Sequence, residues 1–340
     1  MSSQAIQLLT KKTLTHSLQG MRTQLLLNVR KFASKPPRTV AACIIGDEIL
    51  SGRIADTNAH FLAKECFNRG LDLKKVIVVP DDMNDIGDAV TELSNKYDLV
   101  FTSGGIGPTH DDITYEAIAN AFGLKLEEHK ATVERMLNHG FVREDSILLK
   151  LPEIPNKPKP RPLNAARLRM ATLPTPCSVM FPCDNLWVPL VTVNNNVSIL
   201  PGVPRLFESM IIPYINKVAG ISNSNFANGA YDKKAKFFRQ MIGSNLFEGD
   251  LAPILREVQM EINKKKLGIK IGSYPKWRPS PKDDDEKDIH SDNIKEKSNV
   301  LITFIGRDEE EVKKWKEIVK EKIGGFEVDE DVNINEQTKN

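Results

Sequence analysis

Two adjacent carboxylates follow a glycine-rich turn in the segment FTSGGIGPTHDDITYEAI, residues 101–118. The apolar residues before the glycines predict a strand, and the residues after them predict a helix that starts at the two aspartates. Such a turn lets backbone N–H groups approach a phosphate. Asp111 and Asp112 would repel that anion unless a divalent cation lay between them. The segment therefore predicts a site for a metal ion together with a phosphate.

One aspartate at a helix start has a structural explanation, because a capping carboxylate stabilises the helix by about 1 kcal/mol. A second aspartate exceeds that need, and Asp47 and Asp81 follow two other predicted strands. Because the carboxyl ends of parallel strands meet at one edge of a sheet, we expect these loops to converge. The predicted metal ligands are Asp47, Asp81, Asp111 and Asp112, and carboxylate oxygens fit Mg or Mn.

The elements that must position these residues alternate between strands and helices up to about residue 222. This alternation predicts a three-layer α/β domain with a mostly parallel sheet. The stretch LVTVNNNVSIL predicts a hairpin within it. The later residues predict a small α+β domain with strands near 234–241, 269 and 300–305 and helices near 246–264 and 309–323. The predicted boundaries give a presequence and linker (1–37), the α/β domain (38–222), the small α+β domain (223–330) and a tail (331–340).

The composition excludes several classes of protein. Hydrophobic residues make up 40% of the chain and charged residues 27%, as in ordinary globular proteins. No apolar run approaches the roughly 18 residues of a membrane helix. No basic stripe indicates a nucleic-acid partner. The four cysteines lack the spacing of metal ligands.

Residues 1–37 form the predicted presequence and linker. They are rich in Ser, Thr and Leu, and residues 1–32 contain basic but no acidic side chains. That composition is typical of a mitochondrial transit peptide, with cleavage expected before Ala33. We therefore expect a mitochondrial matrix protein, and the alternative is a basic tail on a cytoplasmic one. Residues 276–299 have almost no apolar side chains, which predicts a disordered surface loop.

Four motifs occur in the order and spacing of the molybdopterin-binding domain family: GDEILSGRIADTN, SGGIGPTHDDIT, NAARLRMATLP and ILPGVP. That family includes the bacterial MoaB and Mog proteins, the N-terminal part of CinA and the N-terminal region of eukaryotic FAD synthase. The sequence most resembles the stand-alone fungal FAD pyrophosphatases. The resemblance implies a MoaB/Mog-like fold for residues 38–222. The segment KIGSYP resembles the domain that follows in CinA-type proteins.

The resemblance also implies roles for individual residues. Asp112 matches the essential aspartate of the molybdenum-cofactor branch, whereas Asp111 replaces an arginine of that branch. This replacement favours the CinA-like pyrophosphatase branch, in which Arg169 stands where a lysine is usual. We thus expect Asp111 and Asp112 to be catalytic. The expected substrate-binding residues are Asn58, Ser103, Gly104, Gly105, Gly107, Thr109, Arg169 and Gly202.

The predicted function is metal-dependent hydrolysis of FAD to FMN and AMP, with ADP-ribose or NADH as poorer substrates. Two alternatives stay open: a molybdopterin-binding or adenylyl-transferring protein of cofactor biosynthesis, and a non-catalytic nucleotide-binding protein. The resemblance implies Co as the cation, and carboxylate ligands alone fit Mg or Mn as well. Potassium is a further candidate ion. It also implies a homo-oligomer. No GK[ST] sequence follows the glycines, which argues against a P-loop ATPase.

Overall fold

The computed structural model describes residues 39–146, 161–218, 236–275 and 298–328. The chain divides into two compact units, residues 1–229 and 230–340, and each is considered by itself. The predicted presequence, the boundary at residue 222, nearly all of the loop 276–299 and the tail 331–340 lie outside the described residues. Among the described helices, none has the length and apolar character needed to cross a membrane.

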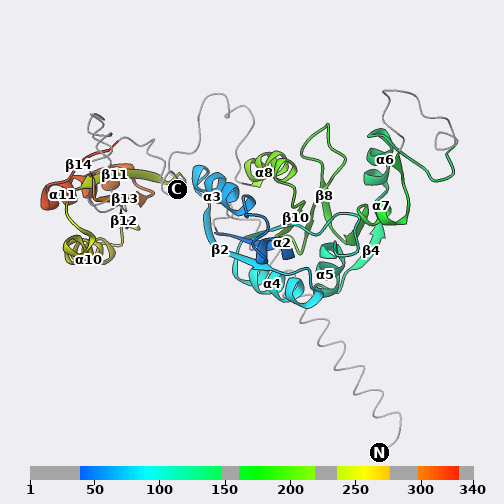
Figure 1. Cartoon of the computed structure of the whole chain (residues 1–340), viewed down its shortest axis with the longest axis horizontal. Coiled ribbons are helices and arrows are strands. Elements are labelled where there is room, and N and C mark those ends of the chain that lie inside the picture. The colour runs from blue at the N-terminus through cyan, green and yellow to red at the C-terminus, as the bar shows by residue number, and fades with distance from the viewer. Residues whose placement is uncertain (1–38, 147–160, 219–235, 276–297, 329–340) are drawn as a thin grey trace, which may run out of the picture. The chain divides into compact units, whose positions relative to one another are not determined.

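The first unit is built on a six-stranded sheet with the order β2-β1-β3-β10-β9-β8 (Figure 1). The strands β2, β1, β3 and β10 run parallel, and β9 and β8 continue the sheet in antiparallel pairing. This confirms the predicted mostly parallel sheet and the hairpin of β9 and β10. The strand bounds are Thr39–Ile45 (β1), Asp72–Val79 (β2), Leu99–Ser103 (β3), Ser178–Met180 (β8), Leu190–Val193 (β9) and Val197–Leu200 (β10).

Helices cover both faces of this sheet (Figure 1). One face packs against α3 (Asn58–Asn68) and α8 (Pro204–Val218). The other packs against α4 (Met83–Lys96) and α5 (Thr114–Ala121). Because both faces are covered, side chains of either direction along β1 are buried, which explains its unbroken apolar sequence. The predicted three-layer α/β fold is therefore confirmed.

Shorter elements surround the sheet. The strands β4 (Lys125–Glu128) and β7 (Thr172–Thr175) pair antiparallel, and β5 (Phe141–Val142) pairs with β6 (Arg161–Pro162) in parallel. The short helices are α2 (Asp47–Leu50), α6 (Lys130–Asn138) and α7 (Ala165–Arg169). The helix α7 lies within the motif NAARLRMATLP, and its Asn164 side chain caps it by accepting the Arg167 N–H.

The helix α5 begins later than the sequence predicted. It starts at Thr114, so Asp111 and Asp112 precede it and do not cap it. The reason is that Thr114 is tied back to the glycine turn. Its N–H donates to the Gly105 carbonyl over 2.9 Å and its hydroxyl donates to the Gly104 carbonyl over 2.9 Å. The chain therefore stays wrapped around the turn until residue 114.

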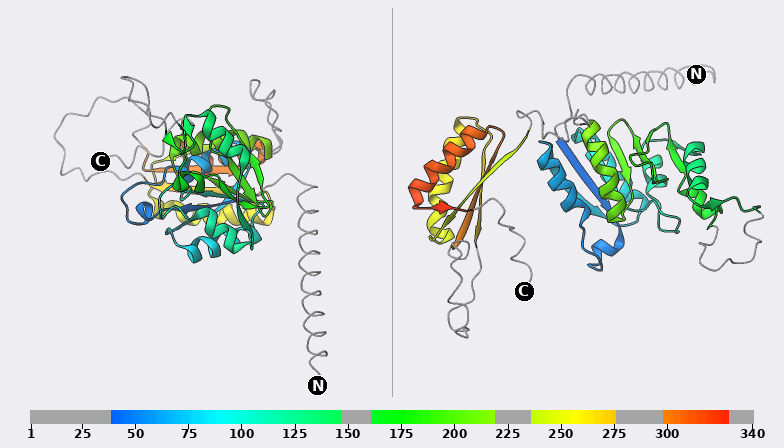
Figure 2. Two further views of the ribbon diagram at one scale, coloured as in Figure 1. Left: turned by 90° about the vertical axis from the view of Figure 1, so that its right-hand side faces the viewer. Right: turned by 90° about the horizontal axis from the view of Figure 1, so that it is seen from above.

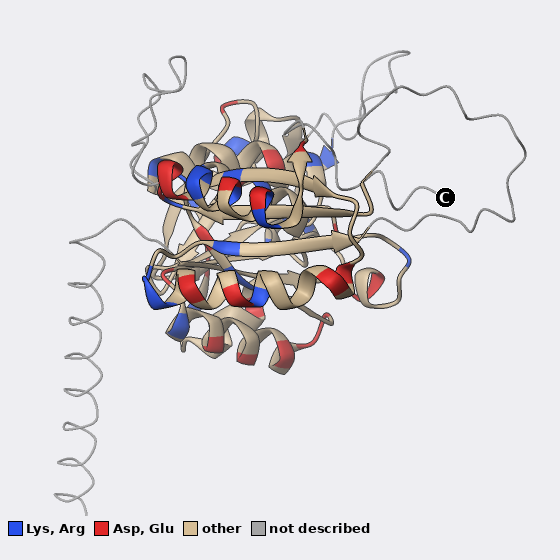
Figure 3. Cartoon of the chain, turned by 90° about the vertical axis from the view of Figure 1, so that its left-hand side faces the viewer, with Lys and Arg blue, Asp and Glu red and all other residues tan. Residues whose placement is uncertain are grey.

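The second unit has a four-stranded antiparallel sheet with the order β12-β13-β11-β14. The two helices described in this unit cover one face of that sheet (Figure 2, right). The bounds are Phe238–Ser244 (β11), Glu248–Lys264 (α10), Lys270–Pro275 (β12), Val300–Gly306 (β13), Glu309–Ile323 (α11) and Phe326–Glu327 (β14). Acidic and basic residues are interspersed along α11, as the red and blue stretches of its ribbon show (Figure 3). The predicted small α+β domain is confirmed in its elements.

Candidate active site

A cavity of about 390 Å³ lies where β1, β2, β3 and β10 end. Loops that follow all four parallel strands contribute to its wall, as expected for ligand sites of open α/β sheets. The loops predicted to converge therefore do converge. The lining residues are Ile45, Gly46, Glu48, Asp81, Gly104, Gly105, Ile106, Gly107, Asp111, Asp112, Tyr115, Met170, Trp187, Val188, Pro201, Gly202, Val203 and Leu206.

The glycine turn needs glycine at its first two positions. Gly104 and Gly105 have φ values of +119° and +63°, which residues with a side chain rarely adopt. A Cβ atom on Gly104 would also lie only 2.1 Å from the Ile45 carbonyl oxygen. The turn after β3 is therefore held directly against the end of β1.

Three successive N–H groups of this turn are available to a ligand. The Gly104 N–H donates to the Leu200 carbonyl over 3.3 Å. Those of Gly105, Ile106 and Gly107 have no acceptor among the described residues, although all three residues line the cavity. Consecutive unpaired N–H groups form a concave anion-binding site. The predicted phosphate-binding role of Gly105 and Gly107 therefore agrees with the geometry.

Carboxylates line the same cavity. Asp81 lies at its wall, and its Oδ2 accepts the Asp47 backbone N–H over 3.1 Å. Burial raises the pKa of Asp81, and the nearby charges of Asp47, Glu48 and Asp111 raise it further. These carboxylates are therefore close enough to repel one another. A cation would relieve that repulsion.

The four predicted metal ligands do not form a complete protein cage. In the part of the chain that the structure describes, no three His, Cys, Asp or Glu side chains gather closely enough to hold a metal. Asp47 also does not line the cavity, and its backbone N–H donates to the Asp81 carboxylate instead. Mg²⁺ commonly binds through one or two carboxylates together with substrate phosphates. Asp81 and Asp111, beside the unpaired N–H groups, fit that kind of shared site.

Asp112 closes the loop that carries it. Its Oδ2 accepts the Thr109 backbone N–H over 2.9 Å and also the Thr109 hydroxyl. Asp112 lines the cavity, whereas Thr109 does not. The structure thus gives Thr109 a role in fixing the aspartate rather than direct contact with the cavity. The side chain of His110 is 99% exposed, and its Nδ1 lies 3.9 Å from Asp111 Oδ1.

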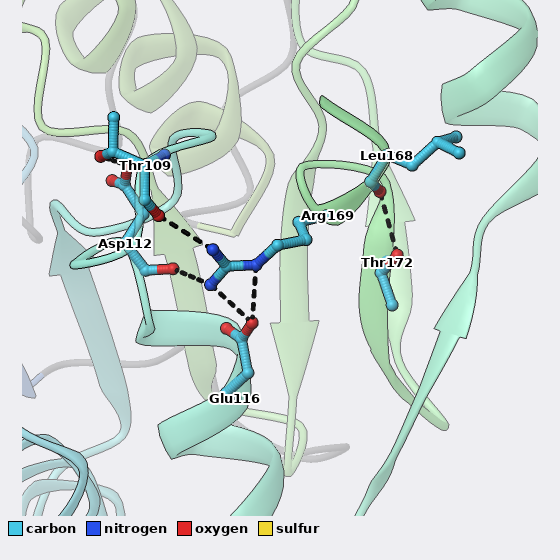
Figure 4. Close-up of polar contacts among 6 residues, drawn as sticks. All are labelled: Thr109, Asp112, Glu116, Leu168, Arg169 and Thr172. Atoms are coloured by element: carbon cyan, nitrogen blue, oxygen red, sulfur yellow. Dashed lines mark hydrogen bonds and ion pairs between the residues drawn. The ribbon is translucent and has the colours of Figure 1, made fainter. Parts of the chain in front are cut away.

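Arg169 clamps this loop onto helix α5 (Figure 4). Its Nη1 donates to the Thr109 carbonyl over 2.9 Å, and its Nη2 donates to the Asp112 carbonyl over 2.8 Å. Nε and Nη2 also donate to Glu116 Oε1 over 3.2 and 2.9 Å. Arg169 does not line the cavity. Its guanidinium positions the loop, and the predicted direct contact with substrate finds no support in this arrangement.

Asn58 and Ser103 hold the opposite loop in place. Asn58 Nδ2 donates to the Ser103 hydroxyl oxygen over 2.9 Å and to the Gly202 carbonyl over 2.8 Å. Both side chains are buried, and neither residue lines the cavity. Gly202 does line it. Of the predicted substrate-binding residues, the four glycines therefore reach the cavity, and the polar side chains of the set support its walls.

Sequence reasoning missed Tyr115, Met170 and Trp187, which also line the cavity. Tyr115 is 3% exposed, and its buried hydroxyl has no hydrogen-bond partner among the described residues. Burial raises the pKa of this phenol, so that it stays a proton donor. The Trp187 ring packs edge-on against Phe141 with 5.5 Å between the centroids. Met170 lies within the motif NAARLRMATLP and Tyr115 directly follows SGGIGPTHDDIT, so these two motifs could have indicated them, whereas no motif or periodic pattern marks Trp187.

The chain resembles known proteins in both units. Residues 41–218 match the family described as "Probable molybdopterin binding domain", and residues 236–331 match "FAD synthase, middle domain". A probable FAD synthase of Caenorhabditis briggsae is 30% identical over 251 residues, which is 71% of this chain and 44% of that protein. A protein of Archaeoglobus fulgidus is 28% identical over 270 residues, 79% of this chain and 91% of that protein.

Among solved structures, CinA from Thermoplasma acidophilum is similar to this chain. It shares 27% identity, with a TM-score of 0.42, over 54% of this chain and 99% of that one. The chain spans less than half the length, 44%, of the Caenorhabditis FAD synthases that it matches. The family match covers more than half of the chain and contains all four motifs. The chain belongs to the molybdopterin-binding domain family, and its first unit has the MoaB/Mog-like α/β fold.

Proposed function

We propose that this protein is a metal-dependent pyrophosphatase that hydrolyses FAD to FMN and AMP. One observation carries the proposal: the three unpaired N–H groups of residues 105–107 share a cavity with Glu48, Asp81 and Asp111. The N–H groups attract an anion, and the carboxylates attract a cation. A diphosphate carried with a divalent cation satisfies both halves of the site.

The residues of the chain divide the work between them. The N–H groups of Gly105, Ile106 and Gly107 bind the diphosphate oxygens and orient the anhydride. Asp81 and Asp111 would hold the cation at the diphosphate. When bound, a divalent cation neutralises charge that develops on the phosphates and lowers the pKa of water. Asp112, fixed by Thr109, accepts the proton that the attacking water loses.

Two observations support hydrolysis of FAD in particular. The curated relatives from Caenorhabditis carry the name probable FAD synthase, which supports a flavin dinucleotide as the ligand. The carboxylates of the cavity could hold a divalent cation beside the phosphates, and such a cation lowers the pKa of bound water and so supplies a nucleophile. The proposal therefore assigns the attack to water, and the products are FMN and AMP.

The test is an incubation of the full chain with FAD, NADH or ADP-ribose and with Mg, Mn or Co, each with and without EDTA and potassium. Product chromatography should show equal amounts of FMN and AMP from FAD, and EDTA should stop their formation. A parallel arm offers FMN and ATP. Net formation of FAD in that arm, or full turnover of FAD in excess EDTA, would contradict the proposal.

We further propose that residues 1–32 direct the protein to the mitochondrial matrix. The support is their content of basic and hydroxyl side chains without acidic ones. A C-terminally tagged protein should co-purify with mitochondria, and its mature N-terminus should be Ala33. A full-length protein found only in the cytoplasm would show that the segment is not a presequence.

A further inference from the structure

We propose that the apolar wall of the cavity binds the isoalloxazine ring of the flavin, so that the FMN half of FAD enters the cavity. This inference rests on the proposed function for the identity of the dinucleotide. The apolar wall consists of Met170, Trp187, Val188, Val203 and Leu206. None of the five side chains is charged, in contrast with the acidic residues that line the same cavity.

The Trp187 side chain is held in place by its neighbours and can stack against a planar ring. It is partly buried, and its indole packs edge-on against the buried Phe141 at an interplanar angle of 78°. A tryptophan held in this way loses little conformational entropy when a ligand stacks on it. Aromatic pairs prefer stacked or edge-on geometries and contribute beyond simple burial of area. The wall therefore favours an aromatic ligand group.

Val203 supplies a second sign that the wall is incomplete without a ligand. It is 56% exposed although it lines the cavity beside the partly buried Leu206. Burial of a large apolar side chain by a bound ring is favourable, by about 25 cal/mol per Å² of apolar surface removed from water. A planar ring between Trp187 and Val203 would cover both.

The chemistry of the wall distinguishes the two rings of FAD. Specific recognition of adenine needs hydrogen-bond partners for its polar edge. In the apolar wall, Trp187 carries a strong side-chain donor, the indole N–H, and the Met170 thioether is only a weak acceptor. Isoalloxazine has a polar pyrimidine edge as well, but its opposite edge is an apolar dimethylbenzene ring and its stacking area is larger. At about 390 Å³, the cavity is near the lower end of the range for small-molecule sites, so it accommodates one half of a dinucleotide.

The experiment measures binding of FMN and AMP without turnover, in EDTA. FMN should quench the tryptophan emission of the wild-type protein and of Trp315→Phe, a change in the second unit. The quenching should be lost in Trp187→Phe. By flavin anisotropy, Trp187→Ala should weaken FMN binding at least about tenfold, the equivalent of one stacking contact. AMP should not displace FMN from the wild-type protein.

Val203→Asp is the second variant, because the exposed position tolerates a charge without loss of the fold. It should weaken FMN binding, with a melting temperature close to that of the wild type. Displacement of FMN by AMP, or unchanged FMN affinity in both Trp187→Ala and Val203→Asp, would overturn the inference. If FMN binding depends on Trp187 but FAD is not hydrolysed with any metal, the proposed function fails and the flavin subsite stands.

Discussion

Arg169 and Glu116 form an ion pair in which Nε and Nη2 of the guanidinium both meet Oε1 of the carboxylate. The pair joins the end of α7 to the first turn of α5. The same guanidinium also holds the carbonyls of Thr109 and Asp112 (Figure 4). One planar group thus fixes the position of the loop that carries the two aspartates. Only the fork of donors in arginine can make all of these contacts at once.

Arg169→Lys should therefore lower kcat for FAD by about tenfold to a hundredfold, because a loop displaced by about 1 Å costs that much in rate. The melting temperature should change little, since partly exposed ion pairs contribute about 0–1 kcal/mol. Steady-state kinetics and thermal melts measure the two effects. Arg167→Lys is the matched control, because Arg167 lies on the same helix but contacts the Pro162 carbonyl. Equal losses in both variants would refute a specific role of Arg169.

Asp112→Asn separates the charge of this residue from its role in the loop. The amide oxygen can still accept the Thr109 N–H and hydroxyl, so the variant should melt near the wild-type temperature. Its hydrolysis of FAD should fall by at least about a hundredfold, because a carboxylate that accepts a proton is lost. Asp112→Ala should lose both stability and activity. Near-normal turnover by Asp112→Asn would show that the aspartate only closes its loop.

The sequence predicted the sheet and its helices because β1 and β3 are continuous, mostly apolar runs, α4 has apolar residues at helical spacing, and clear turn residues separate these elements. It also predicted the convergence of the loops, because parallel strands bring their carboxyl ends together. It could not predict the start of α5, which depends on bonds from Thr114 to the glycine turn. Trp187 could not be found either, because it lies in an irregular segment before β9 whose position depends on tertiary packing.

Asp81→Asn tests the repulsion among the carboxylates. The raised pKa of Asp81 means that the folded state loses stability as the pH rises through that pKa. At pH 7 in EDTA the variant should therefore melt at or above the wild-type temperature, and the difference should shrink as the pH falls toward 4. Millimolar Mg²⁺ or Mn²⁺ should raise the melting temperature of the wild type more than that of the variant. An equal response to metal in both proteins would exclude Asp81 as a ligand.

Tyr115→Phe tests whether the unpaired hydroxyl serves a ligand. A buried hydroxyl without a partner costs about 1–3 kcal/mol, so its removal should raise the melting temperature of the free protein. If the hydroxyl donates to bound FAD, KM should rise about threefold to tenfold, the value of one hydrogen bond. Differential scanning fluorimetry of both proteins with and without FMN gives an independent measure of how much the hydroxyl contributes to ligand binding. An unchanged KM together with a raised melting temperature would limit Tyr115 to a packing role.

The contact between Gly104 and the Ile45 carbonyl has a consequence for how this protein can diversify. A side chain at Gly104 would push β3 away from β1, so the phosphate half of the cavity tolerates almost no variation. The apolar wall lies on other segments, and Val203 has open space around its side chain. In the proposed function, substitutions there would change which ring is accepted while the anhydride stays in one place. The fold would then separate a constrained phosphate turn from an adjustable apolar wall, so that new substrates could be acquired without rebuilding the chemistry.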